Sequence, residues 1–434
     1  MKAIKKLILI FAYFFHFFLF IFIILISSFC IIRFAIASSS RIGHFAGGNS
    51  YYLLKKRHNL LKKPNRKCID FFILDNKISN KQVYKLLSKK LFFLPYYFRP
   101  LYKIISIFSG AKKHLLDFGE SHSDKKIIFE HNDVHNLYQI KPFVPLYNFE
   151  QKDVDLALKE MKDLGLKNSD KIVVLINRDN NYLRKEFPKF DWLYKKQNSD
   201  IENYKQAILN LISNGYKVVR IGLKQEQYLD LKNDKYIDLY QSGKRSDLLE
   251  VYLVSICKFQ IGNYSGGSVM AMWMFNKPTL IVNQIPLNSF RNFNEIFIFK
   301  LIYNKREKKY LSISENYDLL NSPNGPMILN ASRDTKKDSA YQIDVENKFY
   351  NYTEEDIDII ENTKDEITSA VNDMLNYIEN SLKFEKNNME FREKFIKVIK
   401  NNLNQYPKLK KFQGSEIKCF LGNHFFRKYI DLIK

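Results

Sequence analysis

Short apolar runs alternate with amphipathic stretches along the middle of the chain. Five runs are β-branched and apolar enough to predict buried strands, at residues 171–179, 216–222, 235–240, 258–262 and 278–284. Between them, residues 200–215 carry apolar side chains at helical spacing and end at Gly215, and residues 245–258 predict a second helix. Strands that alternate with helices indicate a parallel sheet, whose ligands bind at the carboxyl ends of the strands.

The same alternation begins nearer the N-terminus and weakens toward the C-terminus. Strands are predicted at residues 30–38 and 68–75, and helices at residues 49–63 and 80–91. Far downstream, residues 354–382 predict a helix that begins with an acidic stretch.

The chain of 434 residues is too long for a single hydrophobic core. Pro142 and Pro145 fall in a connection that sets the domain boundary near residue 150. We therefore predict an α/β fold with two Rossmann-like domains that face a cleft, residues 29–150 and 151–330. The remainder, residues 331–434, is expected to be a helical, basic tail that packs on the two domains.

The N-terminal segment is strongly apolar. Residues 7–28 contain no Asp, Glu, Lys or Arg and are long enough to cross a bilayer as a helix. A secretory signal is the alternative, because Lys2, Lys5 and Lys6 precede the run and small residues follow it, but the run is longer than a usual signal core. We predict an uncleaved transmembrane anchor at residues 1–28.

The formal net charge is +23, which favours anionic partners. Next to an apolar N-terminus this charge points to an anionic membrane surface, and no nucleic-acid-binding motif accompanies it. Four widely spaced cysteines show neither a disulfide framework nor zinc-ligand spacing, so no metal site is predicted.

The strongest local signal is the turn after the strand at 258–262. Ser265, Gly266 and Gly267 open a helix there, and free backbone N–H groups at a helix start bind anions that glycines allow to approach closely. A diphosphate would sit at such a turn. The alternative is a serine N-cap with two small residues for close packing.

A second signal is the Arg178-Asp179 pair at the end of the strand at 171–179. Arg178 offers a bidentate fork for phosphate, and Asp179 can orient it or act as a base. A surface ion pair is the competing interpretation. Arg220 ends the next strand and is expected to project into the same crevice as a further donor-binding residue.

A third signal lies in the predicted loop after the first strand. Arg41, Gly43 and His44 are the expected acceptor-binding residues there, and His44 is a candidate general base because its ordinary pKa lies near neutrality. A solvated loop histidine is the alternative.

Together, the Arg41–His44 element, the strand ending in Arg178-Asp179, the GYKVVRIG strand and the IGxxSG turn resemble a bacterial family of surface-polysaccharide glycosyltransferases. More distantly, the second half is similar to the GT-B fucosyltransferases. The likeness spans most of residues 41–286.

This resemblance implies a GT-B fold and an inverting, metal-independent transfer of a hexosyl or deoxyhexosyl group from a nucleotide-diphosphate sugar. The acceptor would be a surface polysaccharide or a lipid-linked glycan, and no cofactor is implied. In the fucosyltransferase relatives a basic motif and a serine-containing turn contact the diphosphate, and these roles fall on Arg178 and residues 265–267. The relatives can have two arginines where this chain has one, so the resemblance does not identify the donor sugar.

Two other functions stay open at this point. A GT-B-like nucleotide-sugar epimerase would share the diphosphate site but has no need of an anchor, and an inactive membrane-bound glycan-assembly protein would retain the fold without turnover. Nucleotide sugars are cytosolic, so an enzyme is expected on the cytoplasmic face of the inner membrane. Arg33, Arg41 and the basic cluster at residues 55–57 leave the orientation undecided.

Overall fold

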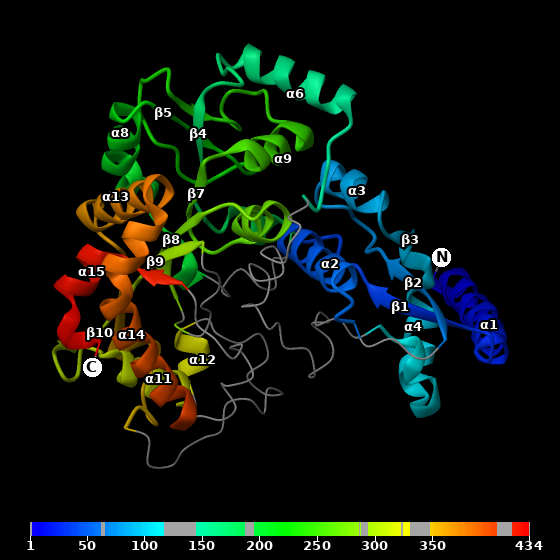
Figure 1. The fold of residues 1–434 in the computed structure, drawn as a ribbon. Coiled ribbons are helices and arrows are strands. Elements are labelled where there is room, and N and C mark those ends of the chain that lie inside the picture. Colours follow the sequence, from blue (N-terminus) through cyan, green and yellow to red (C-terminus); the bar gives the residue numbers. More distant parts are fainter. Residues whose placement is uncertain are drawn as a thin grey trace. The chain divides into compact units, whose positions relative to one another are not determined.

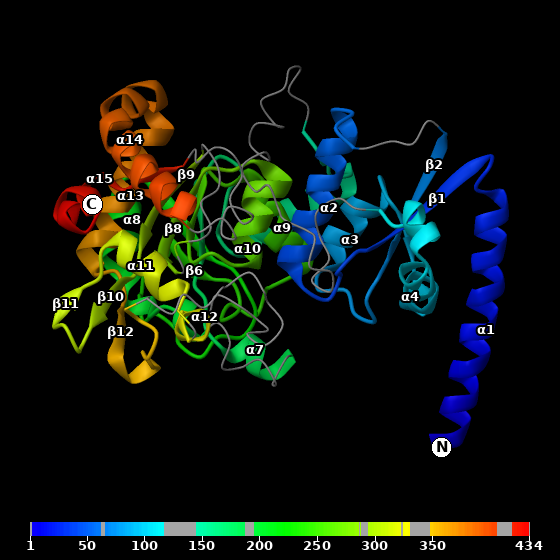
Figure 2. The same ribbon diagram turned by 90° about the horizontal axis from the view of Figure 1, so that it is seen from below.

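The computed structural model describes residues 2–61, 66–116, 145–186, 195–285, 287, 294–322, 324–329, 348–405 and 419–433. These residues form two compact units (Figures 1 and 2). The first contains the described residues up to 116 together with residues 145–149, and the second contains those from Glu150 onward. Each unit has a parallel β-sheet flanked by helices, so the predicted α/β class is confirmed.

The first unit is built on a three-stranded parallel sheet whose strands follow sequence order. Its main elements are α1 (Lys2–Ile26), β1 (Cys30–Ile36), α2 (Ile42–Arg57), β2 (Lys67–Ile73), α3 (Lys81–Ser88), β3 (Phe92–Leu94) and α4 (Arg99–Ile107). The strands predicted from residues 30–38 and 68–75 are present as β1 and β2. The Asn80 side chain caps α3 by accepting a hydrogen bond from the Val83 amide at 2.9 Å.

A buried ion pair joins β1 to β2. Arg33 and Asp70 are paired in register, and their side chains meet at 2.6 and 2.9 Å. Tyr52 of α2 donates to the same carboxylate. A one-residue slip of either strand would leave a buried charge without its partner, so this pair holds the register of the sheet.

The helix α2 begins earlier than predicted. The sequence pattern placed Gly43 and His44 in a loop, whereas in the structure they lie in the first turn of α2. Arg41 is extended and serves as the N-cap, and its carbonyl accepts from the Phe45 amide at 2.9 Å. Residues 45–54 are all buried, so this helix has no amphipathic period to mark its start.

The helix α1 packs on the first unit along one side. Phe20 and Ile23 join an apolar cluster with Leu101 and Ile105 of α4. Over the described part of the chain, no helix combines the length and the apolar character that crossing a membrane requires. The transmembrane anchor predicted at residues 1–28 is therefore not confirmed.

The second unit contains a seven-stranded parallel sheet in the order β13-β9-β8-β7-β4-β5-β6. The strands are β4 (Lys171–Ile176), β5 (Tyr216–Arg220), β6 (Tyr236–Asp238), β7 (Phe259–Gly262), β8 (Thr279–Gln284), β9 (Glu295–Phe299) and β13 (Phe420–Leu421). All five strands predicted in the middle of the chain are present. Their side chains are almost entirely buried, as expected for a parallel sheet covered on both faces.

Helices cover both faces of this sheet (Figure 1). The helices of the second unit are α6 (Gln151–Asp163), α7 (Asn181–Glu186), α8 (Lys205–Ser213), α9 (Asp247–Ile256), α10 (Gly266–Val269), α11 (Ile313–Leu320), α12 (Gly325–Ile328), α13 (Lys364–Glu379), α14 (Ser381–Gln405) and α15 (Asn423–Lys428). On one face α8 packs with α13, and on the other α6 packs with α9. Gly215 follows α8 with φ +80°, which confirms it as the stop signal.

The helix predicted at residues 354–382 is wrong in its first part. Ile357–Ile360 form β12, which pairs antiparallel with β10 (Leu301–Asn304), itself paired with β11 (Lys309–Tyr310). The helix α13 starts only after Thr363, whose side chain caps it together with Glu366. The β-branched residues of Ile357–Ile360 favour a strand. The capping box formed by Thr363 and Glu366 marks the residue at which the helix begins.

The order in which successive strands are added to the sheet reverses between β4 and β7, while all strands stay parallel. From β4 it moves outward through β5 and β6, and then returns to place β7 on the other side of β4. Gly262 ends β7 opposite Ile176, with φ +148°, and a Cβ on it would lie 1.9 Å from the Ile176 carbonyl oxygen. Only glycine permits this approach.

We expect Gly262→Ala to lower the free energy of unfolding by more than about 3 kcal/mol, because it adds a backbone clash to an unfavourable φ. Gly215→Ala is the matched control, since its φ is also positive but nothing lies within 4 Å of the added Cβ. It should cost only about 1 kcal/mol. Denaturant melts of both variants measure the difference, and equal losses would contradict the close approach.

Candidate functional site

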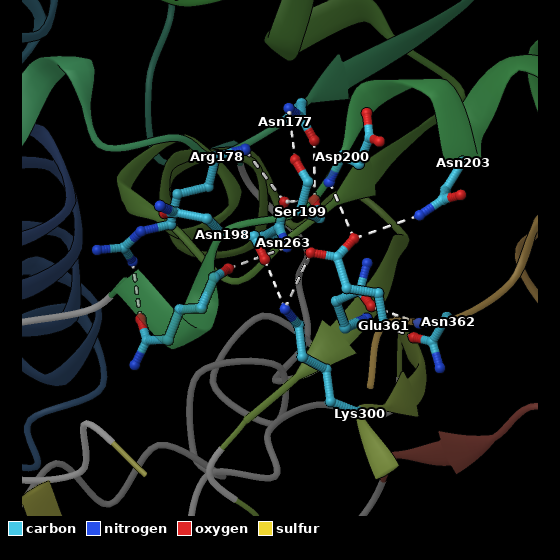
Figure 3. Close-up of polar contacts among 12 residues, drawn as sticks. Asn177, Arg178, Asn198, Ser199, Asp200, Asn203, Asn263, Lys300, Glu361 and Asn362 are labelled. Atoms are coloured by element: carbon cyan, nitrogen blue, oxygen red, sulfur yellow. Dashed lines mark hydrogen bonds and ion pairs between the residues drawn. The ribbon is translucent and has the colours of Figure 1, made fainter. Parts of the chain in front are cut away.

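The point where the chain reverses across the sheet brings two predicted segments together. Residues 177–179 follow β4 and Asn263 follows β7, so both leave the carboxyl edge of the sheet at adjacent strands. Ligands of open parallel sheets bind at such a switch point, where loops diverge from neighbouring strand ends. We therefore build the site from these loops (Figure 3).

Asn263 is the centre of a buried polar network. Its Oδ1 accepts from the Arg178 amide at 3.0 Å and lies 2.7 Å from Ser199 Oγ, and its Nδ2 donates to the Gln197 carbonyl at 3.2 Å. Asn177 contacts Ser199 as well, with Oγ to Oδ1 at 2.8 Å. Asn263 is 1% exposed, so each of these bonds satisfies a group that water does not reach.

Arg178 is held at the rim of this network. Its backbone is fixed by Asn263, and its Nη1 donates to Gln197 Oε1 at 2.8 Å. The side chain is half-buried, so its guanidinium is positioned at the strand end while part of it reaches solvent. A guanidinium in this setting can bind an oxyanion bidentately.

Asp179 bridges two loops. Its Oδ1 accepts from the Asn181 amide at 3.1 Å and its Oδ2 from the Glu226 amide at 2.5 Å. The carboxylate thereby joins the loop after β4 to the loop after β5. Each oxygen retains capacity to accept another hydrogen bond.

Arg220 lies at the end of β5, but its guanidinium is already engaged. It is 2% exposed, and its Nη1 donates to Asp238 at 3.1 Å and to the Gln227 carbonyl at 3.0 Å. Its Nη2 donates to Gln225 at 3.1 Å. A donor phosphate would have to displace these partners.

The serine-glycine turn begins α10 as predicted. The Ser265 amide donates to Ser268 Oγ at 2.7 Å. A Cβ at Gly267 would lie 2.6 Å from Ile176 Cδ1, so this glycine has a packing role against the end of β4. The turn therefore stands beside residues 177–179, on the same edge of the sheet.

A buried lysine at the end of β9, two strands away from β7, supports the network. Lys300 follows β9, is 5% exposed, and donates to the Asn198 carbonyl at 2.6 Å and to Glu361 at 3.3 Å. Glu361 also accepts from the Asp200 amide at 2.9 Å. Desolvation lowers the pKa of Lys300, and the nearby Glu361 carboxylate partly offsets that effect.

Sequence reasoning missed Ser199, Lys300 and Glu361. Ser199 and Glu361 lie outside the predicted strands. Lys300 gave one usable signal, since it is a single lysine inside the otherwise apolar run from Ile296 to Tyr303. Such a lysine needs a buried partner, and the partner is 61 residues away along the chain.

The expected acceptor residues lie in the first unit. Arg41, Gly43 and His44 stand at the start of α2, after the carboxyl end of β1. The neighbouring Ser40 amide donates to Asp75 at 2.8 Å, and Arg99 pairs with the same carboxylate. Within this unit the carboxyl edge of the sheet is thus also polar.

A pocket of about 480 Å³ lies elsewhere, at the amino ends of β4, β5, β7 and β8. It is lined by Lys171, Tyr216, Lys258, Pro278, Tyr377, Ile378, Glu379 and Ser381. None of these residues belongs to a predicted site, and ligands of parallel sheets bind at the opposite edge. We therefore place the site at the carboxyl edge.

No family model and no curated protein sequence matches the chain. Solved structures similar to it are glycosyltransferases. The E. coli ADP-heptose LPS heptosyltransferase II has a TM-score of 0.38 at 12% identity, over 62% of this chain and 90% of that chain. The family 9 glycosyl transferase of Veillonella parvula DSM 2008 has a TM-score of 0.35 at 10% identity, over 58% of this chain and 79% of that chain.

The iron-containing heptosyltransferase TibC, from enterotoxigenic E. coli, was solved with ADP-D-β-D-heptose. It has a TM-score of 0.36 at 13% identity, over 81% of this chain and 77% of that chain. Likenesses this distant leave the function of the chain to be inferred from its own residues.

Removing Glu361 tests how much the network depends on its charged pair. Glu361→Ala leaves the Lys300 ammonium buried with one acceptor, so we expect a loss of roughly 1–3 kcal/mol in the free energy of unfolding. The double variant with Lys300→Met should lose less than the sum of the two single variants. Glu390→Ala, which breaks the exposed pair with Lys394, is the control and should change stability by less than about 0.5 kcal/mol.

Proposed function

We propose that the chain is a glycosyltransferase of the GT-B type. It transfers a sugar from a nucleotide-diphosphate donor to a surface polysaccharide or a lipid-linked glycan, with inversion and without a metal ion. The observation that carries this proposal is Arg178 at the switch point of the parallel sheet, beside the Ser265–Gly267 turn after the neighbouring strand. A cation beside the backbone amides that open a helix, at one edge of the sheet, suits a diphosphate.

Each residue of the proposed donor site has a role in charge stabilisation. As the bond between the sugar C1 and the diphosphate oxygen breaks, negative charge builds on the diphosphate. Arg178 and the amides of Gly266 and Gly267 stabilise that charge. Arg220 is a further donor-side cation only if the phosphate displaces its present partner Asp238. Groups fixed before the reaction stabilise developing charge most effectively, and Gln197 and Asn263 fix Arg178 here.

The acceptor hydroxyl forms the new bond to C1 and gives up its proton to a base. Asp179 and His44 are the two candidates, from the second and the first unit respectively. Arg41 and Gly43 complete the proposed acceptor side. We assign the body of the enzyme to the cytoplasmic face of the inner membrane, because nucleotide sugars are cytosolic.

We expect Arg178→Ala to reduce transfer by about 10²–10³-fold with little loss of stability, because its half-buried side chain supplies charge rather than packing. Arg184→Ala is the matched control: Arg184 is a nearby exposed arginine that pairs with Glu226. Single-turnover assays with a panel of nucleotide sugars measure both. Activity above about a tenth of the wild-type value in Arg178→Ala would remove this residue from the proposal.

The glycine turn makes a separate prediction. If residues 265–267 hold the diphosphate, Gly266→Val should weaken nucleoside-diphosphate binding strongly while the melting temperature changes modestly. If the turn only packs, stability should fall by roughly 1–3 kcal/mol and affinity should stay constant. Calorimetry and thermal melts on the same variant separate these results, and unchanged affinity would exclude the turn as the donor site.

A further inference from the structure

The helix α1 has two faces with opposite environments. His16, Phe20 and Ile23 are 5%, 8% and 2% exposed and recur at helical spacing on the face that packs against the first unit. The opposite face is also apolar, yet Phe18 and Leu25 are 57% and 68% exposed. A helix that is hydrophobic all round is normally buried on all sides. We therefore expect a binding partner to bury the outer face of α1.

The helix α4 lies beside α1 in both views and packs against its inner face (Figures 1 and 2). Phe20 stacks on Phe108 at 5.1 Å, and His16 meets Phe98 edge-on at 5.6 Å. Exposed apolar residues of α1 and of the C-terminal end of α4 define what we call the α1–α4 surface: Phe14, Phe18, Phe22, Leu25, Ile107 and Phe108. Large apolar side chains that are exposed together on one helix mark an interaction site.

The charge of the first unit identifies the partner. Residues 1–128 and 144–149, which make up this unit, contain 23 lysines and arginines but five acidic residues, of which the structure describes Asp70 and Asp75. Both carboxylates are paired with arginines, Arg33 and Arg99. The unit is therefore strongly cationic, and a second copy of it would be repelled.

Cations also stand at both ends of the apolar part of α1. The sequence places Lys2, Lys5 and Lys6 at its start. At its end, Lys113 donates to Ser27 Oγ at 3.0 Å and Arg66 donates to the Ser27 carbonyl at 3.2 Å. Apolar side chains framed by lysines and arginines match the acyl chains and anionic headgroups of one membrane leaflet.

We propose that the α1–α4 surface binds an anionic phospholipid leaflet, with its aromatic side chains among the acyl chains and the basic residues at the headgroups. The helix α1 then lies along the membrane surface, because its inner face is fixed on the body of the unit. This inference stands on the first unit alone and is independent of the proposed enzymatic activity.

Flotation of the full-length protein with vesicles tests the proposal. We expect binding to vesicles of phosphatidylcholine with one quarter phosphatidylglycerol to exceed binding to pure phosphatidylcholine by at least about tenfold, and to weaken as salt increases. Phe18→Asp with Phe22→Asp should reduce binding by about tenfold or more, since both side chains would carry charge into the acyl region. Lys113→Glu, at the end of α1, should weaken only the binding to anionic vesicles.

Leu382→Asp is the matched control, because Leu382 is 82% exposed but belongs to the second unit. It should leave vesicle binding unchanged. Circular dichroism melts confirm that each variant is folded. Vesicle binding that is absent, or that survives Phe18→Asp with Phe22→Asp, overturns the proposal. So does sedimentation showing that these substitutions dissociate a dimer, since the surface would then join two copies.

Discussion

The contact between Gly262 and the Ile176 carbonyl is the constraint on which the second unit depends. A side chain at residue 262 would keep β7 from lying against β4 at its carboxyl end. Because the two strands meet there, Asn263 reaches the amide of Arg178 across 85 residues of sequence. The proposed donor site is thus a consequence of how two backbones approach each other at the switch point.

Around that contact the second unit buries polar side chains that are held by hydrogen bonds. Asn263, Ser199 and Lys300 are all nearly inaccessible, and each finds a hydrogen-bond partner on a different segment. Such a network stabilises little over an apolar core of the same shape, but it has few alternative arrangements. Its effect is to fix the loop from Gln197 to Asn203 and, through Gln197, the guanidinium of Arg178.

The first unit uses buried charge for a different purpose. There Arg33 and Asp70 join two strands of a small sheet and keep its register. A three-stranded sheet has a limited apolar face, and α1 and α4 extend its core through Phe20, Ile23 and Leu101. The same helix leaves its second face uncovered, which connects the stability of this unit to the surface proposed to meet lipid.

The sequence by itself determined β1, β2 and the five strands from β4 to β8, because buried parallel strands are short continuous apolar runs. It also located Arg178 and the Ser265–Gly267 turn, since strand ends are visible in the pattern. It did not predict β3, β9 or β13, or several of the helices around them. It misplaced the start of α2, whose buried residues 45–54 show no amphipathic period, and it missed β12. Only the tertiary structure showed the ion pairs of Lys300 with Glu361 and of Arg220 with Asp238. It alone also showed the hydrogen bond between Asn263 and the Arg178 amide. These contacts depend on strand order, and strand order is set by long-range packing that local periodicity does not record.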